Sequence, residues 1–60
     1  MKIYTPLEVA KILKTGYIKV LKEITLGKLE AFKIGPHFRI TEDQLNNYIR
    51  EQKFAGFNWK

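Results

Sequence analysis

The stretch from Ala31 to Thr41 constrains the fold most, because a Gly-Pro pair separates two short runs in which apolar and charged residues alternate. Such alternation is typical of half-buried β-strands, and glycine and proline mark tight turns. We therefore expect a β-hairpin whose loop is residues 35–37. Each expected strand carries one cation, Lys33 in the first and Arg39 in the second. Because neighbouring side chains of a strand point to opposite faces, we expect one face to bury the aromatic and branched residues and the other to present both cations.

The segment before this hairpin opens with a helix start signal. Thr5 and Glu8 form a T-x-x-E capping box, in which each side chain satisfies the other residue's backbone N–H, and the proline between them fits the first helical position. This predicts a helix over residues 6–13. We expect residues 14–16 to end it, with Gly16 adopting the unusual backbone angles of a tight turn.

A second helix is expected over residues 17–25, closed by Gly27 as a C-terminal cap. Val20 lies on its natural core-facing side. Ile18 and Leu21 lie on a different side, which gives this short helix a second apolar surface.

A third helix is expected after the hairpin, where Thr41 and Gln44 form a second capping box. The apolar residues that follow have the i, i+3, i+4 spacing of a helix: Leu45, Tyr48 and Ile49. This helix should end near Gln52. Residues 53–60 then form a short tail with three aromatic residues.

Length and composition limit the architecture. Sixty residues make a single domain with a thin core, and the absence of cysteine removes disulfides and thiolate–zinc sites as supports. The sequence therefore predicts an α+β domain over residues 1–52, with the order helix, helix, β-hairpin, helix, followed by the aromatic tail at residues 53–60. Two short helices followed by a basic hairpin outline a winged helix-turn-helix.

The charge of the chain is unevenly distributed. The net charge is +5, and residues 1–40 hold eight lysines and arginines against three glutamates, whereas residues 41–60 are balanced. Such an excess points to a polyanionic partner, and its position indicates that the first two-thirds of the chain makes the contact. The chain shows neither a leader-like apolar run nor the roughly 20 apolar residues that cross a bilayer, so we expect a cytoplasmic protein with no membrane partner.

Catalytic and metal chemistry find little support in the sequence. The only adjacent acids, Glu42 and Asp43, stand where a helix N-terminus favours negative charge. His37 is the single histidine and has no nearby partner of a metal-ligating type. We therefore expect a binding protein and not an enzyme, with no metal and no cofactor.

The cations and aromatic residues fit nucleic-acid binding. In a helix-turn-helix the second helix enters the major groove with its first residues against the base edges, and here a basic hairpin follows it. The candidate DNA contacts are Tyr17, Ile18, Lys19 and Lys22 on this helix, and Lys33, His37 and Arg39 on the hairpin.

Five segments together resemble the small excisionase-type winged helix, a group related to the DNA-binding domains of the mercury-resistance regulator (MerR) family: Tyr4–Ala10, Ile12–Leu13, Gly27–Leu29, Ala31–Gly35 and Phe38–Ile40. The resemblance runs without gaps from about Tyr4 to Ile49. It implies a double-stranded DNA-binding protein of a phage, plasmid or other mobile element. Such a protein acts as a recombination directionality factor or a small transcription regulator and binds beside an integrase or further copies of itself. The resemblance places the second helix in the major groove and the hairpin, as a wing, on the flanking backbone or minor groove.

The chain differs from this family in its second helix. The family usually has a serine or threonine cap followed by arginines or polar residues, where this chain has Gly16-Tyr17-Ile18. Glu23 occupies a position that is more often apolar.

Two other functions fit the same sequence. The first is a protein-interaction module or inhibitor of winged-helix shape that uses the Ile18/Leu21 surface and the aromatic tail, because exposed apolar patches usually mark protein contacts. The second is single-stranded nucleic-acid binding, in which Tyr17, Phe57 and Trp59 stack on bases.

Overall fold

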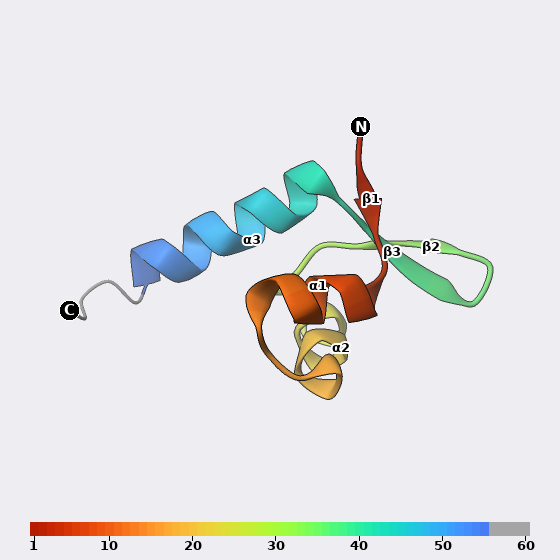
Figure 1. Ribbon diagram of the computed structural model, residues 1–60, viewed down its shortest axis with the longest axis horizontal. Coiled ribbons are helices and arrows are strands. Elements are labelled where there is room, and N and C mark those ends of the chain that lie inside the picture. Colours follow the sequence, from red (N-terminus) through yellow and green to blue (C-terminus); the bar gives the residue numbers. More distant parts are fainter. Residues whose placement is uncertain (56–60) are drawn as a thin grey trace.

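The computed structural model describes residues 1–55 and shows an α+β fold of three helices and a three-stranded antiparallel sheet (Figure 1). In chain order the elements are β1 (Ile3–Tyr4), α1 (Pro6–Leu13), α2 (Tyr17–Thr25), β2 (Phe32–Ile34), β3 (His37–Thr41) and α3 (Glu42–Ala55). The sheet order is β1-β3-β2, so β3 is the central strand. The β2–β3 hairpin and α3 extend from opposite sides of the domain, with α1 and α2 between them (Figure 1).

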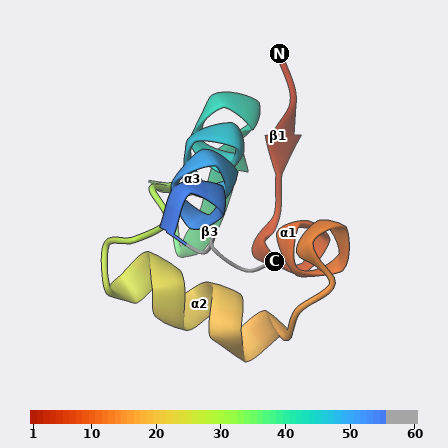
Figure 2. The same ribbon diagram turned by 90° about the vertical axis from the view of Figure 1, so that its left-hand side faces the viewer.

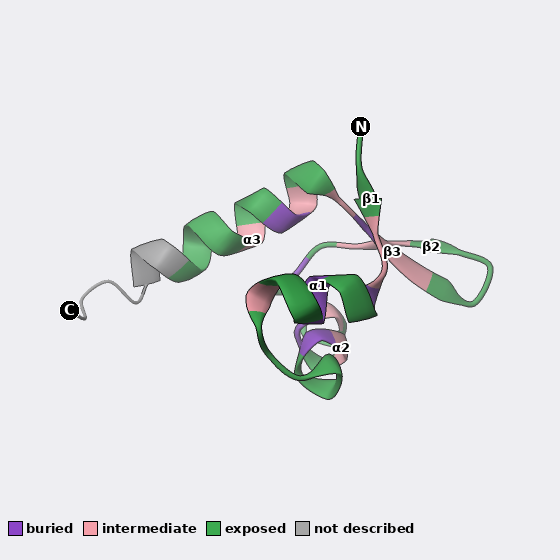
Figure 3. Cartoon of the chain, viewed as in Figure 1, coloured by how far each residue is buried: buried purple, intermediate pink, exposed green. Residues whose placement is uncertain are grey.

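The core forms where α1, α2, β3 and α3 meet (Figure 3). Its buried apolar side chains are Val9, Ala10, Val20, Leu29, Ile40 and Leu45. Viewed along α3, the helices α1 and α2 and strand β1 lie around this centre (Figure 2). Because this cluster has only six side chains, the loss of any of them removes a large share of the core.

The local signals at the helix ends are confirmed. Thr5 Oγ1 accepts a hydrogen bond from the Glu8 backbone N–H (3.0 Å) while Glu8 Oε1 accepts one from the Thr5 N–H (2.8 Å). Thr41 and Gln44 form the same reciprocal pair at 3.0 and 2.9 Å before α3. Gly27 has a φ of 81°, and the N–H groups of Gly27 and Lys28 bond to carbonyls in the last turns of α2, which is the Schellman arrangement.

The turn between α1 and α2 differs from expectation. The left-handed residue is Lys14, with φ 56° and ψ 47°, whereas Gly16 is extended and stands at the N-cap of α2. The expectation for Gly16 is therefore wrong. The Lys14 and Thr15 N–H groups bond to the carbonyls of Lys11 (3.2 Å) and Ala10 (2.9 Å), so the helix end requires a left-handed residue two positions before the glycine.

Replacing Lys14 by glycine is expected to stabilise the protein by about 1 kcal/mol, because the Cβ atom that makes this conformation costly is removed. Chemical denaturation followed by circular dichroism measures the change. Lys11→Gly is the matched control: the same exchange inside α1 should destabilise the protein by about 1 kcal/mol. A loss of stability in Lys14→Gly would contradict the prediction.

The hairpin has a shorter loop than the sequence suggests. Its loop is Gly35-Pro36, with Gly35 at φ 60° as the first position of a two-residue hairpin turn requires, and His37 already belongs to β3. Phe32 therefore pairs with Arg39, and Lys33 pairs with Phe38. Because directly opposite residues share a face, Lys33 and Arg39 lie on opposite faces of the hairpin. The prediction of one apolar and one cationic face is wrong.

Two element boundaries also differ. The sequence analysis missed β1, a two-residue strand in which Ile3 pairs with Thr41 and Tyr4 with Ile40. α3 continues to Ala55, three residues beyond the expected end. Residues 53–55 of the predicted tail are thus helical, and residues 56–60 lie outside the described part of the chain.

Candidate nucleic-acid interface

Helix α2 has a core-facing side and an outward side, with a flank on each side between them. Val20 and Glu23 face the core, whereas Ile18, Lys22 and Thr25 share the outward side at i, i+4 and i+7 and are exposed. Ile18 is 72% exposed. The outward stripe therefore places an exposed isoleucine one helical turn from an exposed lysine.

A groove joins one flank of α2 to the hairpin. Tyr17 and Leu21 line it from α2, and its other walls come from the hairpin and from the start of α1: Pro36, His37, Phe38, Arg39, Thr5, Pro6 and Leu7. Tyr17 is 44% exposed there. The groove brings three of the candidate DNA contacts together: Tyr17 meets His37 and Arg39, which lie 20 and 22 positions later in the sequence.

The two hairpin cations are held in different ways. The Lys33 ammonium lies over the Phe38 ring, 5.1 Å from its centroid, on the face that these paired residues share. Arg39 donates from Nη1 to the carbonyl oxygen of Phe38 at 2.6 Å and is half-buried. Phe38 thus positions both cations, one by its ring and one by its carbonyl. The remaining N–H donors of Arg39 are available to an anion at the groove, which Lys33 does not line.

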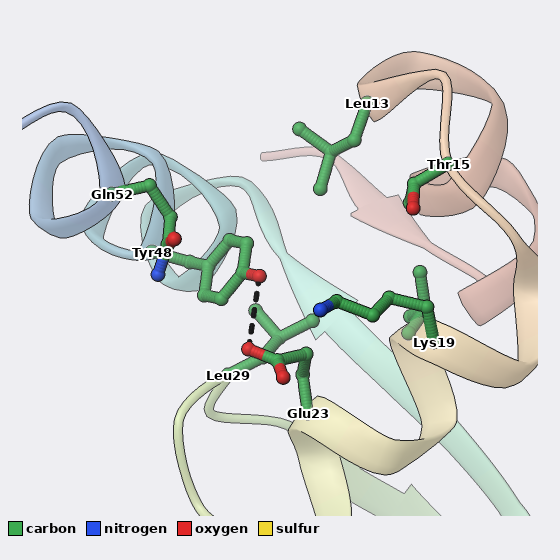
Figure 4. A pocket seen from close by; sticks show the side chains of 8 residues that line it. Leu13, Thr15, Lys19, Glu23, Leu29, Tyr48 and Gln52 are labelled. Carbon is green, nitrogen blue, oxygen red and sulfur yellow. Dashed lines mark hydrogen bonds between the residues drawn. The ribbon is translucent and has the colours of Figure 1, made fainter. Parts of the chain in front are cut away.

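Lys19 lies apart from the hairpin. It shares the second flank of α2 with Glu23 and extends into a largely apolar pocket between α1, α2 and α3, also lined by Leu13, Leu29 and Tyr48 (Figure 4). Neither lysine of α2, Lys19 nor Lys22, lines the hairpin groove. Lys22 belongs to the outward stripe, whereas Lys19 lines the pocket beside α3.

The same pocket explains the glutamate at an apolar position. Glu23 is only 8% exposed, and its Oε1 accepts a hydrogen bond of 3.1 Å from the Tyr48 hydroxyl (Figure 4). Burial raises the pKa of Tyr48, and the hydrogen bond to Glu23 and the charge of Glu23 raise it further. This hydrogen bond joins α2 to α3.

Cations on the α3 side of the domain have acidic neighbours. Lys28 and Arg50 line a polar groove that also contains Glu30 and Glu51, and Arg50 donates to Asn47 Oδ1 at 2.8 Å. By contrast, no acidic side chain lines the groove between α2 and the hairpin. A polyanion is therefore favoured at the hairpin side.

Two apolar residues of the hairpin groove, Leu7 and Phe38, were not expected from the sequence, and Leu21 was expected beside Ile18 as a protein contact and not as part of this groove. Leu7 belongs to the apolar stripe of α1, yet it is half exposed. The spacing of Leu7 did not predict this exposure, because the small core covers only part of the apolar stripe of α1. Phe38 could have been found only from the hairpin register.

Comparison of the chain with protein-family models, with curated proteins and with solved structures finds no match. Within residues 1–55, no three side chains of metal-ligating type come together as a cation site would require. Over the same residues, no helix combines the length and the apolar character that a bilayer span needs.

Proposed function

We propose that this chain binds double-stranded DNA as a winged helix-turn-helix protein, with α2 in the major groove and the β2–β3 hairpin as a wing on the flanking backbone or minor groove. The observation that carries the proposal is the acid-free groove in which the first turn of α2 meets Arg39 and His37. The +5 net charge lies wholly within the first 40 residues, which contain all of these elements.

The resemblance to excisionase-type proteins extends the proposal to a biological role. The protein then serves a phage, plasmid or other mobile element in the cytoplasm, either directing an integrase towards excision or regulating transcription. Single DNA-binding modules bury about 600–1,000 Å² of protein surface. A 60-residue domain therefore gains tight specific binding by cooperating with adjacent copies or with an integrase.

A salt titration tests the proposal. The protein is titrated by fluorescence anisotropy against a labelled random 30-base-pair duplex and the matching single strand, from low to moderate salt. We expect duplex binding that weakens steeply with salt, because each phosphate contact releases counterions. The double variant Lys22→Ala/Arg39→Ala should bind at least tenfold more weakly, and its salt slope should fall by about 2, since each lost phosphate contact removes about 0.9.

The chain offers a matched control for charge. Lys28→Ala/Arg50→Ala removes the same two residue types from the polar groove of the α3 side. This variant should retain duplex affinity to within about threefold after correction for net charge. Equal losses in both double variants would show that only the total charge matters. No duplex binding at low salt, or tighter binding to the single strand, would overturn the proposal.

The exposure of Ile18 favours one other candidate function, a protein-interaction module. In that case Ile18 packs against a partner protein or a second copy, and its apolar surface leaves water. Sedimentation of the wild type and of Ile18→Ser separates the two candidates, since loss of self-association with unchanged duplex affinity would favour the protein contact.

A further inference from the structure

The outward stripe of α2 is strongly exposed, and its side chains can contact a base edge in only a few ways. Ile18 stands in the first turn of the helix, and at 72% its exposed fraction exceeds that of every other large apolar residue within residues 1–52 except Met1. In a helix that enters the major groove, residues of the first turn face the base edges. Ile18, the most exposed apolar side chain of α2, is therefore at a position that would face the bases.

The other side chains of this stripe offer few ways to read a base edge. Thr25 uses its hydroxyl to donate to the Leu21 carbonyl at 3.0 Å. Lys22 is a point charge on a flexible stem, suited to a phosphate. No arginine, asparagine or glutamine occurs in α2, and these side chains make the bidentate contacts that identify guanine and adenine. On the outward stripe, Lys22 is therefore the side chain left to hydrogen-bond a base edge, and the base it can contact is guanine.

The major groove offers one apolar group, the C5-methyl of thymine. We propose that Ile18 reads this methyl group, so that the preferred ligand is a duplex with thymine in the major groove facing α2. The inference rests on the proposed DNA-binding function and deepens it by naming the class of base. Lys22, one turn along the same stripe, supplies phosphate affinity, and Ile18 supplies the preference for thymine.

Uracil-substituted DNA provides a direct test, because deoxyuridine differs from thymidine only at this methyl group. Two labelled 30-base-pair alternating duplexes are compared by anisotropy, one containing adenine and thymine, the other adenine and uracil. We expect the wild type to bind the thymine duplex about fourfold more tightly for each methyl group buried, given the usual gain from removing one such group from water. A guanine–5-methylcytosine duplex should gain similarly over its unmethylated form.

Two variants make the test specific to Ile18. Ile18→Ala should bind the thymine and uracil duplexes equally, with little change in affinity for the uracil duplex. Lys22→Ala should weaken binding to both and keep the preference for thymine. Ile18 is exposed, so Ile18→Ala should keep the wild-type circular dichroism spectrum.

Three outcomes would overturn the inference, and they differ in whether the proposed DNA binding survives. Equal wild-type affinity for both duplexes would refute methyl reading and leave duplex binding in place. A thymine preference that survives in Ile18→Ala would assign the reading to another residue. Absence of binding to every duplex at low salt would remove the proposed function together with the inference.

Discussion

Ile40→Ala is expected to lower the free energy of unfolding by about 3 kcal/mol, within a usual range of about 2–5 kcal/mol for such core truncations. Ile40 is fully buried in the central strand β3, pairs with Tyr4 of β1 and belongs to the cluster shared with α1, α2 and α3. A domain of this length has about 3–9 kcal/mol of stability in total. The variant should therefore lose between a third and all of its stability, as urea denaturation followed by circular dichroism at 222 nm would show.

Ile34→Ala is the control for this substitution. The substitution is again isoleucine to alanine, but Ile34 lies in the neighbouring strand β2, next to the hairpin turn, and its side chain is 59% exposed. Its truncation should lower the free energy of unfolding by less than 1 kcal/mol, because folding buries only a small part of the Ile34 side chain. Similar losses for Ile34→Ala and Ile40→Ala would contradict a core centred on β3. Ile40→Val should lie between them, at about 1 kcal/mol.

The features that were read correctly from the sequence are those fixed by neighbouring residues. Both capping boxes join residues three apart, and the glycine cap at Gly27 joins α2 to the residues directly after it. The helix starts and the end of α2 could be predicted for this reason. The start of α2 matters for the candidate interface, because it places Tyr17 and Ile18 in the first helical turn.

The hairpin shows why the candidate site could be predicted only in part. A three-residue loop over residues 35–37 would pair Lys33 with Arg39, whereas the observed two-residue loop pairs Lys33 with Phe38. A one-residue change of register moves the whole of β3 to the other face relative to β2. Lys33 and Arg39 were correctly predicted to lie on the two strands of one hairpin. The faces to which they point depend on the length of the turn, which the Gly-Pro pair alone does not determine.

Other features depend on residues far apart in the chain. β1 has only two residues and no period of its own, and it exists because β3 provides a partner nearly 40 positions later. The burial of Glu23 likewise depends on Tyr48, 25 positions away. Neither contact leaves a local pattern, so the sequence indicated Glu23 only as a charged residue where an apolar one is usual.

Tyr48→Phe is expected to cost about 1–3 kcal/mol at pH 7, because it leaves the buried Glu23 side chain without its donor. Urea denaturation measures the loss. Glu23→Gln is the matched variant, since its amide oxygen can still accept from the Tyr48 hydroxyl. We expect a smaller loss in Glu23→Gln than in Tyr48→Phe. The reverse order would mean that the hydrogen bond contributes little to stability.

The same pair should make stability depend on alkaline pH. Burial, the hydrogen bond to Glu23 and the charge of Glu23 raise the pKa of Tyr48 above its ordinary value of 10.0. The folded state therefore holds this proton when the unfolded state has released it. The contribution of Tyr48 is fully present below pH 10 and is lost as the pH rises from there through the raised pKa of the folded protein.

The free-energy difference between the wild type and Tyr48→Phe should accordingly shrink between pH 8 and pH 11. Lysine titration in this range is common to both proteins and cancels in the difference. In Glu23→Gln the carboxylate charge is absent, so the alkaline loss of stability should be smaller than in the wild type. A difference between the wild type and Tyr48→Phe that stays constant from pH 8 to pH 11 would contradict this coupling.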